Sequence, residues 1–238
     1  MLIDESEIEA LNDAALRRSG LAQRNLALAS KAIDLLHAFA SEQAFNKDDD
    51  VTVIRLAIRV LNDAGASGKC ALAGYYQQAL AHIRDIIEVA FLLDLFRRKP
   101  DQIRVWREAS EKDRKRFFKP VILRETLDKL DGREDKARQE AYSFYSGFGT
   151  HVTPHLELIS PNSLTQIGPF PSEQIIVLLT YDLTKWLCAA TGYAMKSLDP
   201  RRISDSGRSM ALTKQKLDFA LGMTNWLATP QVENSPSE

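Results

Sequence analysis

Apolar residues recur three and four positions apart along almost the whole chain, and the strict alternation typical of strands is almost absent. This pattern predicts an all-α protein that folds as a multi-helix bundle. Two long helices should form its centre. Further helices are expected at about 5–45, 51–64, 101–109, 121–131, 135–148 and 211–227.

Two seams of apolar residues define the expected central helices. The first helix, over Leu72–Arg97, ends before Pro100, and the second, over Ser172–Lys196, begins at a favourable N-cap serine. Each seam buries one side of its helix, so the two seams should face each other. The seams consist of Leu72, Tyr76, Ala79, Ile83, Ile86, Ala90 and Leu93, and of Ile176, Leu179, Leu183, Trp186, Ala190 and Tyr193.

Polar and glycine-containing stretches separate the helices. "EQAFNKDDDVTV" interrupts the helical pattern, and Asp50 within it can cap the helix that follows. "NDAGASGK", with Gly65, Gly68 and Lys69, should be a turn between helices, because it lacks the P-loop spacing and a preceding strand. Leu198–Ser209 is expected to be a polar loop. A long connection is expected around four prolines, Pro154, Pro161, Pro169 and Pro171.

These breaks suggest how the chain is organised. We expect one all-helical domain over residues 1–228, with residues 65–197 as its core bundle. Residues 1–46 are a candidate separate helical layer at the N-terminus. The tail, residues 229–238, has too few apolar residues to pack and should be disordered.

The composition is that of an ordinary soluble globular protein, with 45% hydrophobic residues, 26% charged residues and a net charge of −1. The acidic N-terminus does not resemble a signal peptide, and Asp182 and Lys185 interrupt the best candidate for a membrane span. A cytoplasmic protein that does not enter the membrane is therefore expected. Cys70 and Cys188 lie far apart and fit neither a disulfide framework nor a zinc site.

Charge is distributed unevenly along the chain. The first fifty residues hold five basic and ten acidic side chains, whereas Arg97–Arg124 holds eleven basic and four acidic ones. This basic stretch could bind RNA, weakly and with a strong salt dependence, or attract an acidic protein or a second copy's N-terminal helix. Alternatively, it is a solvated face anchored by its aromatics. The candidate binding residues are Arg104, Arg107, Arg114, Lys115, Arg116 and Lys119, interleaved with Trp106, Phe117 and Phe118.

Three charged residues occupy positions where the seams predict burial. Arg84 and Glu88 lie one turn apart on the first central helix, and Asp182 lies beside the seam of the second. Buried charges need partners, and the nearest candidates are one another and the histidines of "YSFYSGFGTHVTPH", Tyr142 to His155. The set is either a structural network or a site in which His151 transfers a proton and Arg84 stabilises phosphate charge.

The histidines are also candidate metal ligands. His151, His155 and Glu157 have a spacing that could hold a divalent ion. Pro154 argues against this, since it should end the helix near His151 and spoil the one-face geometry that ligands four residues apart require. The two remaining histidines stand alone on helices, so no metal and no cofactor is expected.

The segment "HIRDIIEVAFLLDLF", a following proline, a Trp-containing amphipathic helix and then "YSFYSGFGTHVTP" together resemble a group of bacterial helical proteins. This group is distantly related to the HEPN superfamily, and the resemblance covers about residues 65–197. In that group an Arg-x-x-x-Glu helix faces a later helix that ends in a Tyr, Ser and His-Pro pattern. The matching positions are Arg84, Glu88, Tyr142, Ser146, His151 and, one residue late, Pro154.

HEPN proteins that cleave RNA carry an arginine followed, after four to six residues, by a histidine, and the two meet at a dimer cleft. This sequence departs from that motif, because no arginine stands at the required distance before His151 or His155. The resemblance therefore implies a helical bundle more directly than it implies a reaction.

Two functions remain open, and the chain contains no recognisable catalytic motif that decides whether it is an enzyme. The first is a non-enzymatic or degenerate HEPN-like module that binds a protein or RNA partner, or a second copy, through its basic face. The second is a HEPN-like ribonuclease that uses His151 and Arg84. The candidate catalytic residues are Arg84, Glu88, Ser146, His151 and Asp182.

Overall fold

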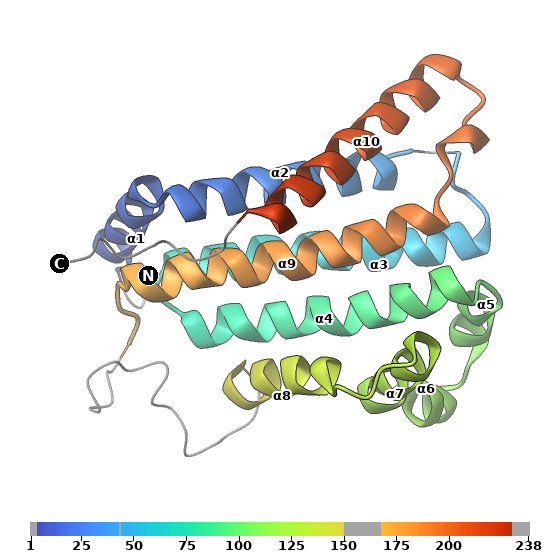
Figure 1. The fold of residues 1–238 in the computed structure, drawn as a ribbon, viewed down its shortest axis with the longest axis horizontal. Coiled ribbons are helices and arrows are strands. Elements are labelled where there is room, and N and C mark those ends of the chain that lie inside the picture. Colours follow the sequence, from blue (N-terminus) through green and yellow to red (C-terminus); the bar gives the residue numbers. More distant parts are fainter. Residues whose placement is uncertain (1–3, 43, 150–167, 230–238) are drawn as a thin grey trace.

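The computed structural model describes residues 4–42, 44–149 and 168–229, and every regular element within them is helical. The expected all-α, multi-helix bundle is therefore confirmed (Figure 1). The elements are α1 (Ser6–Arg18), α2 (Gly20–Ala40), α3 (Asp48–Leu72), α4 (Tyr76–Arg98), α5 (Asp101–Glu108), α6 (Glu111–Phe117), α7 (Pro120–Asp131), α8 (Ala137–Gly149), α9 (Glu173–Ser197), the 3₁₀ turn η2 (Pro200–Arg202) and α10 (Ser206–Ala228).

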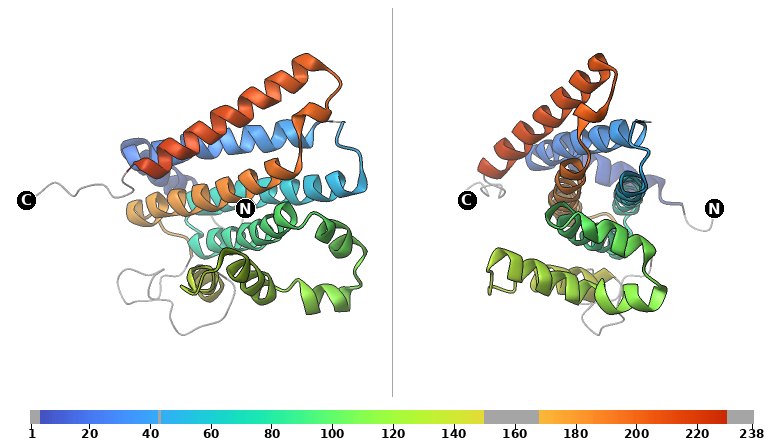
Figure 2. Two further views of the ribbon diagram at one scale, coloured as in Figure 1. Left: turned by 45° about the vertical axis from the view of Figure 1, so that its right-hand side comes forward. Right: turned by 90° about the vertical axis from the view of Figure 1, so that its right-hand side faces the viewer.

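Four long helices, α2, α3, α4 and α9, pack side by side around the main core (Figure 1, Figure 2). The expected contact between the two central helices is confirmed in α4 and α9: Ile83 is fully buried and Leu179 is 6% exposed. α4 is enclosed by α3, α9, α7 and α8. Apolar residues therefore cover nearly all sides of its second half, as expected for a helix at the centre of a bundle.

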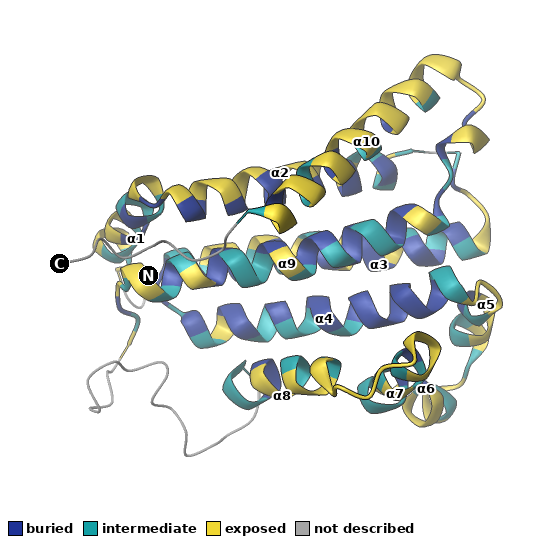
Figure 3. Cartoon of the chain, in the orientation of Figure 1, coloured by how far each residue is buried: buried dark blue, intermediate teal, exposed yellow. Residues whose placement is uncertain are grey.

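The remaining helices form outer layers on this core. α1 and α10 pack against α2, while α7 and α8 cover α4 on the opposite side of the bundle (Figure 1). α5 and α6 lie at the end of the bundle where α4 finishes. Exposed residues dominate the outer helices, most clearly along α10 (Figure 3).

The first predicted helix, 5–45, is two helices that meet at Ser19. The Ser19 hydroxyl accepts a hydrogen bond from the Ala22 amide at 3.1 Å, which caps α2 and breaks the helix in a stretch where the apolar pattern is continuous. The expected role of Asp50 is also wrong. α3 begins at Asp48, and the Asp50 carboxylate instead pairs with Arg202, which lies far away in the sequence.

The turn expected at Gly65–Lys69 is wrong, because α3 continues as a helix to Leu72. Ala64, Ser67 and Ala71 are buried along this extension, and this packing outweighs the helix penalty of the two glycines. The turn lies instead at Gly74, whose φ of +83° favours glycine. A β-carbon there would also meet the Phe170 carbonyl oxygen at 2.6 Å.

Other differences concern segments expected to be irregular. α10 begins at Ser206, inside the predicted loop, because Asp205 accepts a hydrogen bond from the Arg208 amide at 3.0 Å and caps the helix. The basic stretch contains an additional short helix, α6, capped by Ser110. Most of the proline-rich connection and nearly all of the predicted tail lie outside the described residues.

Among the described helices, α9 alone has the length and apolar composition needed to cross a membrane. Its most apolar window is 44% buried within the bundle. Central core helices meet the same two criteria, and α9 contacts α2, α3 and α4.

Candidate functional site

Arg84, Glu88, Tyr142 and Ser146 form one connected polar cluster between α4 and α8. Arg84 Nε donates to Ser146 Oγ at 3.1 Å, and its Nη2 donates to the Tyr142 hydroxyl at 2.5 Å. Glu88 Oε1 accepts from both neighbours, at 2.5 Å from Arg84 Nη2 and 2.6 Å from the Tyr142 hydroxyl. The structure thus brings together the four described residues that the resemblance pairs.

Local packing fixes α8 over the start of α4. Gly149 lies so close to α4 that a β-carbon on it would sit 2.8 Å from the Ala81 amide nitrogen. Ala81 is one turn before Arg84 on the same helix, so this contact positions the last turn of α8 beside the cluster. The Arg124 guanidinium of α7 lies 4.9 Å from the centre of the Tyr142 ring.

The cluster is half-buried and internally satisfied. The side chains of Arg84 and Glu88 are 24% and 29% exposed, and Ser146 is buried. Burial, reinforced by the hydrogen bond to Glu88, raises the pKa of Tyr142, so the phenol stays protonated at neutral pH. Because three neighbours already engage the Arg84 guanidinium, the geometry is that of a network binding α8 to α4.

Asp182 belongs to a separate cluster. Tyr145 is its neighbour, and the Tyr145 ring packs edge-on against Trp186 with ring centroids 6.5 Å apart. Burial raises the pKa of Asp182, and the neighbouring Tyr145 hydroxyl opposes the rise. The described contacts therefore place Asp182 with Tyr145 rather than with Arg84 and Glu88. His151, His155, Pro154 and Glu157 lie outside the described residues.

Much of the positive charge of the basic stretch is neutralised by ion pairs within the protein. Arg97 and Arg98 bind the buried carboxylate of Asp94, and Arg107 binds Asp49 on α3. The Lys115 ammonium pairs with Glu111 one turn earlier, at the surface. Of the six candidate binding residues, Arg104, Arg114, Arg116 and Lys119 have no carboxylate partner among the described residues.

The helix α6 is the most solvent-facing part of this stretch. None of its residues is buried, and the Phe117 ring at its end is 50% exposed. The Arg116 guanidinium lies 4.9 Å from the centre of that ring. The neighbouring aromatics behave as the anchors expected for a solvated face: Phe118 is buried, and Trp106 packs edge-on against Phe96 with ring centroids 6.0 Å apart.

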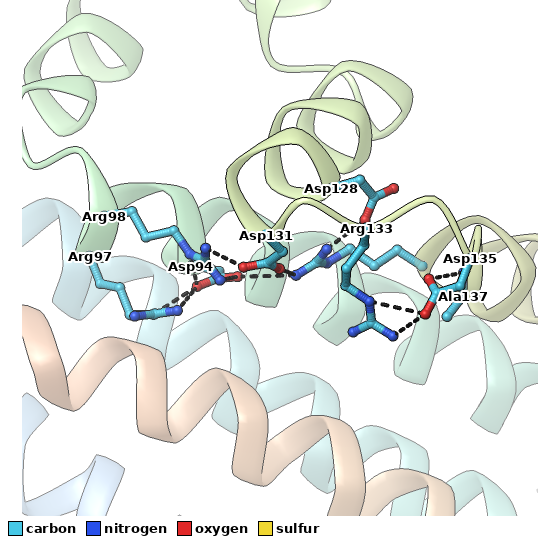
Figure 4. A network of polar contacts seen from close by, with 9 residues as sticks. Asp94, Arg97, Arg98, Asp128, Asp131, Arg133, Asp135 and Ala137 are labelled. Carbon is cyan, nitrogen blue, oxygen red and sulfur yellow. Dashed lines mark hydrogen bonds and ion pairs between the residues drawn. The ribbon is translucent and has the colours of Figure 1, made fainter.

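Asp94 is the centre of a second charged network, which joins α4 to α7 and α8 (Figure 4). Its carboxylate is 1% exposed and is bound by Arg97 and Arg98. Arg98 and Arg138 also bind Asp131, and together they lower the pKa of that carboxyl to about 2. Because carboxylates of α4 and α7 already neutralise these arginines, the network is a structural clamp rather than an anion site.

A pair of neighbouring carboxyl groups between α3 and α4 was not predicted from the sequence. Asp63 and Asp85 lie close enough for Asp85 to raise the pKa of Asp63, while Arg59 binds Asp85 in bidentate fashion at 2.5 and 2.8 Å. His82 Nδ1 lies 2.9 Å from Asp63 Oδ1. Burial, with a further contribution from Asp85, raises the pKa of Asp63 to about 6.

This pair lies in an open depression of about 440 Å³. Within the described part of the chain, no group of three or more His, Cys, Asp or Glu side chains is arranged to hold a metal ion. A signal for the pair was present in the sequence. In a helical hairpin, residues equidistant from the turn face each other, and Gly74 lies midway between Asp63 and Asp85.

Neither cysteine has the environment of an activated nucleophile. Burial raises the pKa of the Cys188 thiol to about 12, and it also raises the pKa of the half-buried Cys70. Thiolate, the reactive form, is therefore scarce at neutral pH at both positions.

The chain matches no protein family, no curated protein and no solved structure with significance. A functional conclusion therefore rests on the geometry of the site.

Proposed function

We propose that this protein is a non-enzymatic HEPN-like helical module that binds an acidic protein partner through α6. The HEPN-like assignment is supported by the contact of Arg84 and Glu88 with Tyr142 and Ser146, since the resemblance pairs these two helices. A non-enzymatic role is supported by the contacts of the Arg84 guanidinium, which already binds Ser146, Tyr142 and Glu88 instead of facing a substrate.

The exposure of α6 carries the binding proposal. Because α6 has no buried residue, packing against the rest of the protein constrains its sequence little. Its side chains are therefore available to bind a partner. The Arg116 guanidinium lies over the half-exposed ring of Phe117, and Arg114 and Lys119 lie within three residues of Phe117 in the sequence. An apolar aromatic anchor inside a charged rim is the usual anatomy of a protein-binding surface.

A protein partner fits this surface better than RNA. Glu111 and Asp113 lie on the same short helix, and they would repel a phosphate backbone that followed it. Binding of single strands generally needs several stacking aromatics, whereas Phe117 is the one half-exposed aromatic of α5, α6 and α7 in the described chain. An acidic protein surface tolerates mixed charges at its rim.

The test compares two labelled probes by fluorescence anisotropy at graded salt: a 20-residue peptide rich in Glu and Leu, and a single-stranded 20-nucleotide RNA. The peptide should bind wild type, and Arg114→Glu/Lys115→Glu/Arg116→Glu should weaken binding by about 10-fold or more. Phe117→Ala should also weaken it. The matched control is Arg24→Glu/Lys31→Glu/Lys129→Glu, which makes the same charge change at exposed positions outside α6.

If the two triple variants bind the peptide with equal affinity, α6 is not the binding surface. RNA would be the partner, and the proposed protein partner wrong, if RNA binds more tightly than the peptide and this binding is lost when the α6 charges are reversed. In that case the salt slope should flatten in the α6 variant, since phosphate contacts release counterions.

A ribonuclease is the second candidate, favoured by the half-exposed position of the Arg84 cluster beside the end of α8. In this proposal His151 transfers a proton and Arg84 stabilises phosphate charge. The measurement is cleavage of labelled RNA by wild type, His151→Gln and Arg84→Ala, with thermal melting as the check on folding. A loss of cleavage by about 100-fold or more in folded His151→Gln would establish the enzyme and refute the non-enzymatic proposal.

A further inference from the structure

Helix α10 carries two apolar stripes on opposite sides. The inner stripe, Leu212, Phe219 and Trp226, is buried, and Trp226 Nε1 donates to the Asn25 side chain of α2 at 2.8 Å. The outer stripe consists of Met210, Leu217 and Leu221, whose spacing places them within about 40° of the helix circumference and about 180° from Phe219.

The outer stripe is unusually exposed. Met210, Leu217 and Leu221 are 73%, 58% and 55% exposed, and Leu227 near the end of the helix is 68% exposed. Among the described residues, no other large apolar side chain is more exposed than these four. The first half of α10 diverges from the bundle, and exposed residues line it (Figure 1, Figure 3). Contiguous exposed apolar residues of this kind mark an interaction surface.

The charges beside the stripe indicate what covers it. Lys214 and Asp218 lie one turn apart at its edge, and neither forms an ion pair with any described residue. If two copies of α10 pair antiparallel with Met210 of one opposite Leu221 of the other, Lys214 of each copy lies next to Asp218 of the other. A parallel pair in register would instead place like charges at the same level.

We propose that the outer stripe of α10 binds the same stripe of a second copy of this chain, in an antiparallel two-fold pair. The pairing overlaps about 20 residues, or about 30 Å of helix. It removes Met210, Leu217 and Leu221 of both copies from water. Because each copy offers the same surface, the contact closes at a dimer instead of continuing into a filament. The surface is separate from α6, so it is independent of the proposed partner site.

Sedimentation velocity of the full chain over a range of concentrations tests the pairing. Wild type should sediment at twice the chain mass of 26.7 kDa. Leu217→Lys/Leu221→Lys should raise the dissociation constant by about 100-fold or more. At concentrations where both proteins are monomeric, the variant should keep the melting temperature of wild type, because both side chains are exposed in the single chain. The control, Leu130→Lys/Leu178→Lys, changes two other exposed leucines and should leave the dimer intact.

A charge exchange tests the antiparallel register. Lys214→Asp and Asp218→Lys should each weaken self-association, because each places like charges together across the two-fold axis. An equimolar mixture of these two variants should associate more tightly than either alone, since both ion pairs then form between unlike chains.

Three results would overturn the proposal. The first is a monomeric wild type at about 100 μM, and the second is a dimer that survives Leu217→Lys/Leu221→Lys. The third is a monomeric chain that binds vesicles of phosphatidylcholine and phosphatidylserine and loses this binding in the same variant, which would identify the stripe as a lipid-binding face. None of these results bears on the α6 peptide assay.

Discussion

The backbone of Gly149 contacts the backbone of Ala81 so closely that a β-carbon at position 149 would lie 2.8 Å from the Ala81 nitrogen. The neighbour is backbone and cannot move aside as a flexible side chain does. Gly149→Ala should therefore push α8 away from α4 and lower the free energy of unfolding by about 1–3 kcal/mol. Chemical denaturation measures the change.

Gly147→Ala is the matched control, two residues earlier in α8. Apart from Gly147 itself, its chain neighbours and the nearby backbone of α8, no described atom lies within 4 Å of a β-carbon built on Gly147. This replacement should leave stability unchanged or raise it by up to about 1 kcal/mol, since alanine favours helix more than glycine does. Equal effects of the two substitutions would contradict the close approach of α8 and α4.

Leu179 and Leu178 are adjacent on α9 but differ in burial, at 6% and 54% exposed. Leu179→Asp should cost about 3–5 kcal/mol, because the carboxylate would be buried without a partner between α9 and α4. Leu178→Asp should cost well under about 1 kcal/mol, since its side chain reaches solvent. Similar melting temperatures for the two variants would show that the assigned core face of α9 is wrong.

The Asp94 network should be sensitive to loss of its central carboxylate. Asp94→Asn keeps the shape of the side chain but removes the charge that Arg97 and Arg98 bind. A destabilisation of about 3 kcal/mol is expected, because the pair is largely buried. The control, Asp135→Asn, removes a solvent-exposed partner of Arg133 and should change stability little. Urea denaturation at constant salt distinguishes the two.

The Asp63–Asp85 pair should make stability depend on pH. The pKa of Asp63 is about 6 in the folded protein, above its ordinary value of 3.8, so folding favours the protonated form. The contribution of this group is complete below about pH 4 and is lost as the pH rises through about 6. Asp63→Asn stays neutral, so between pH 4 and 6 its stability should improve relative to wild type as the pH rises.

Arg59, His82 and Asp85 are the charged or titratable neighbours of Asp63. The contact with His82 lowers the pKa of Asp63, so His82→Gln should move the stability transition to higher pH. A difference between wild type and Asp63→Asn that does not change from pH 4 to 7 would show that Asp63 is already ionised when folded. Chemical denaturation at each pH provides the free energies.

The sequence by itself determined the helical class and the two central helices. Apolar spacing is a local property, and the seams through Ile83 and Leu179 describe the faces on which α4 and α9 are buried. The pairing of Arg84 and Glu88 also follows from their separation by one helical turn. The contact of Tyr142 and Ser146 with Arg84 and Glu88 was expected only from the resemblance to the group of bacterial helical proteins.

Only the tertiary structure decided where the helices end and which charges meet. Ser19 breaks an otherwise continuous helical pattern by capping α2, and Gly65 and Gly68 stay helical because their neighbours are buried. With the turn placed at Gly65–Lys69 instead of Gly74, the meeting of Asp63 and Asp85 could not be foreseen.

The same limit applies to the surface. The sequence marks Arg97–Arg124 as strongly basic, but the partners that use much of this charge, such as Asp49, Asp94 and Asp131, lie on other helices or at distant turns. Likewise, the apolar spacing of α10 does not reveal which stripe packs inward, because Met210 and Leu212 are equally apolar by type. Burial depends on which helices come together, and that is settled by packing between segments far apart in the chain.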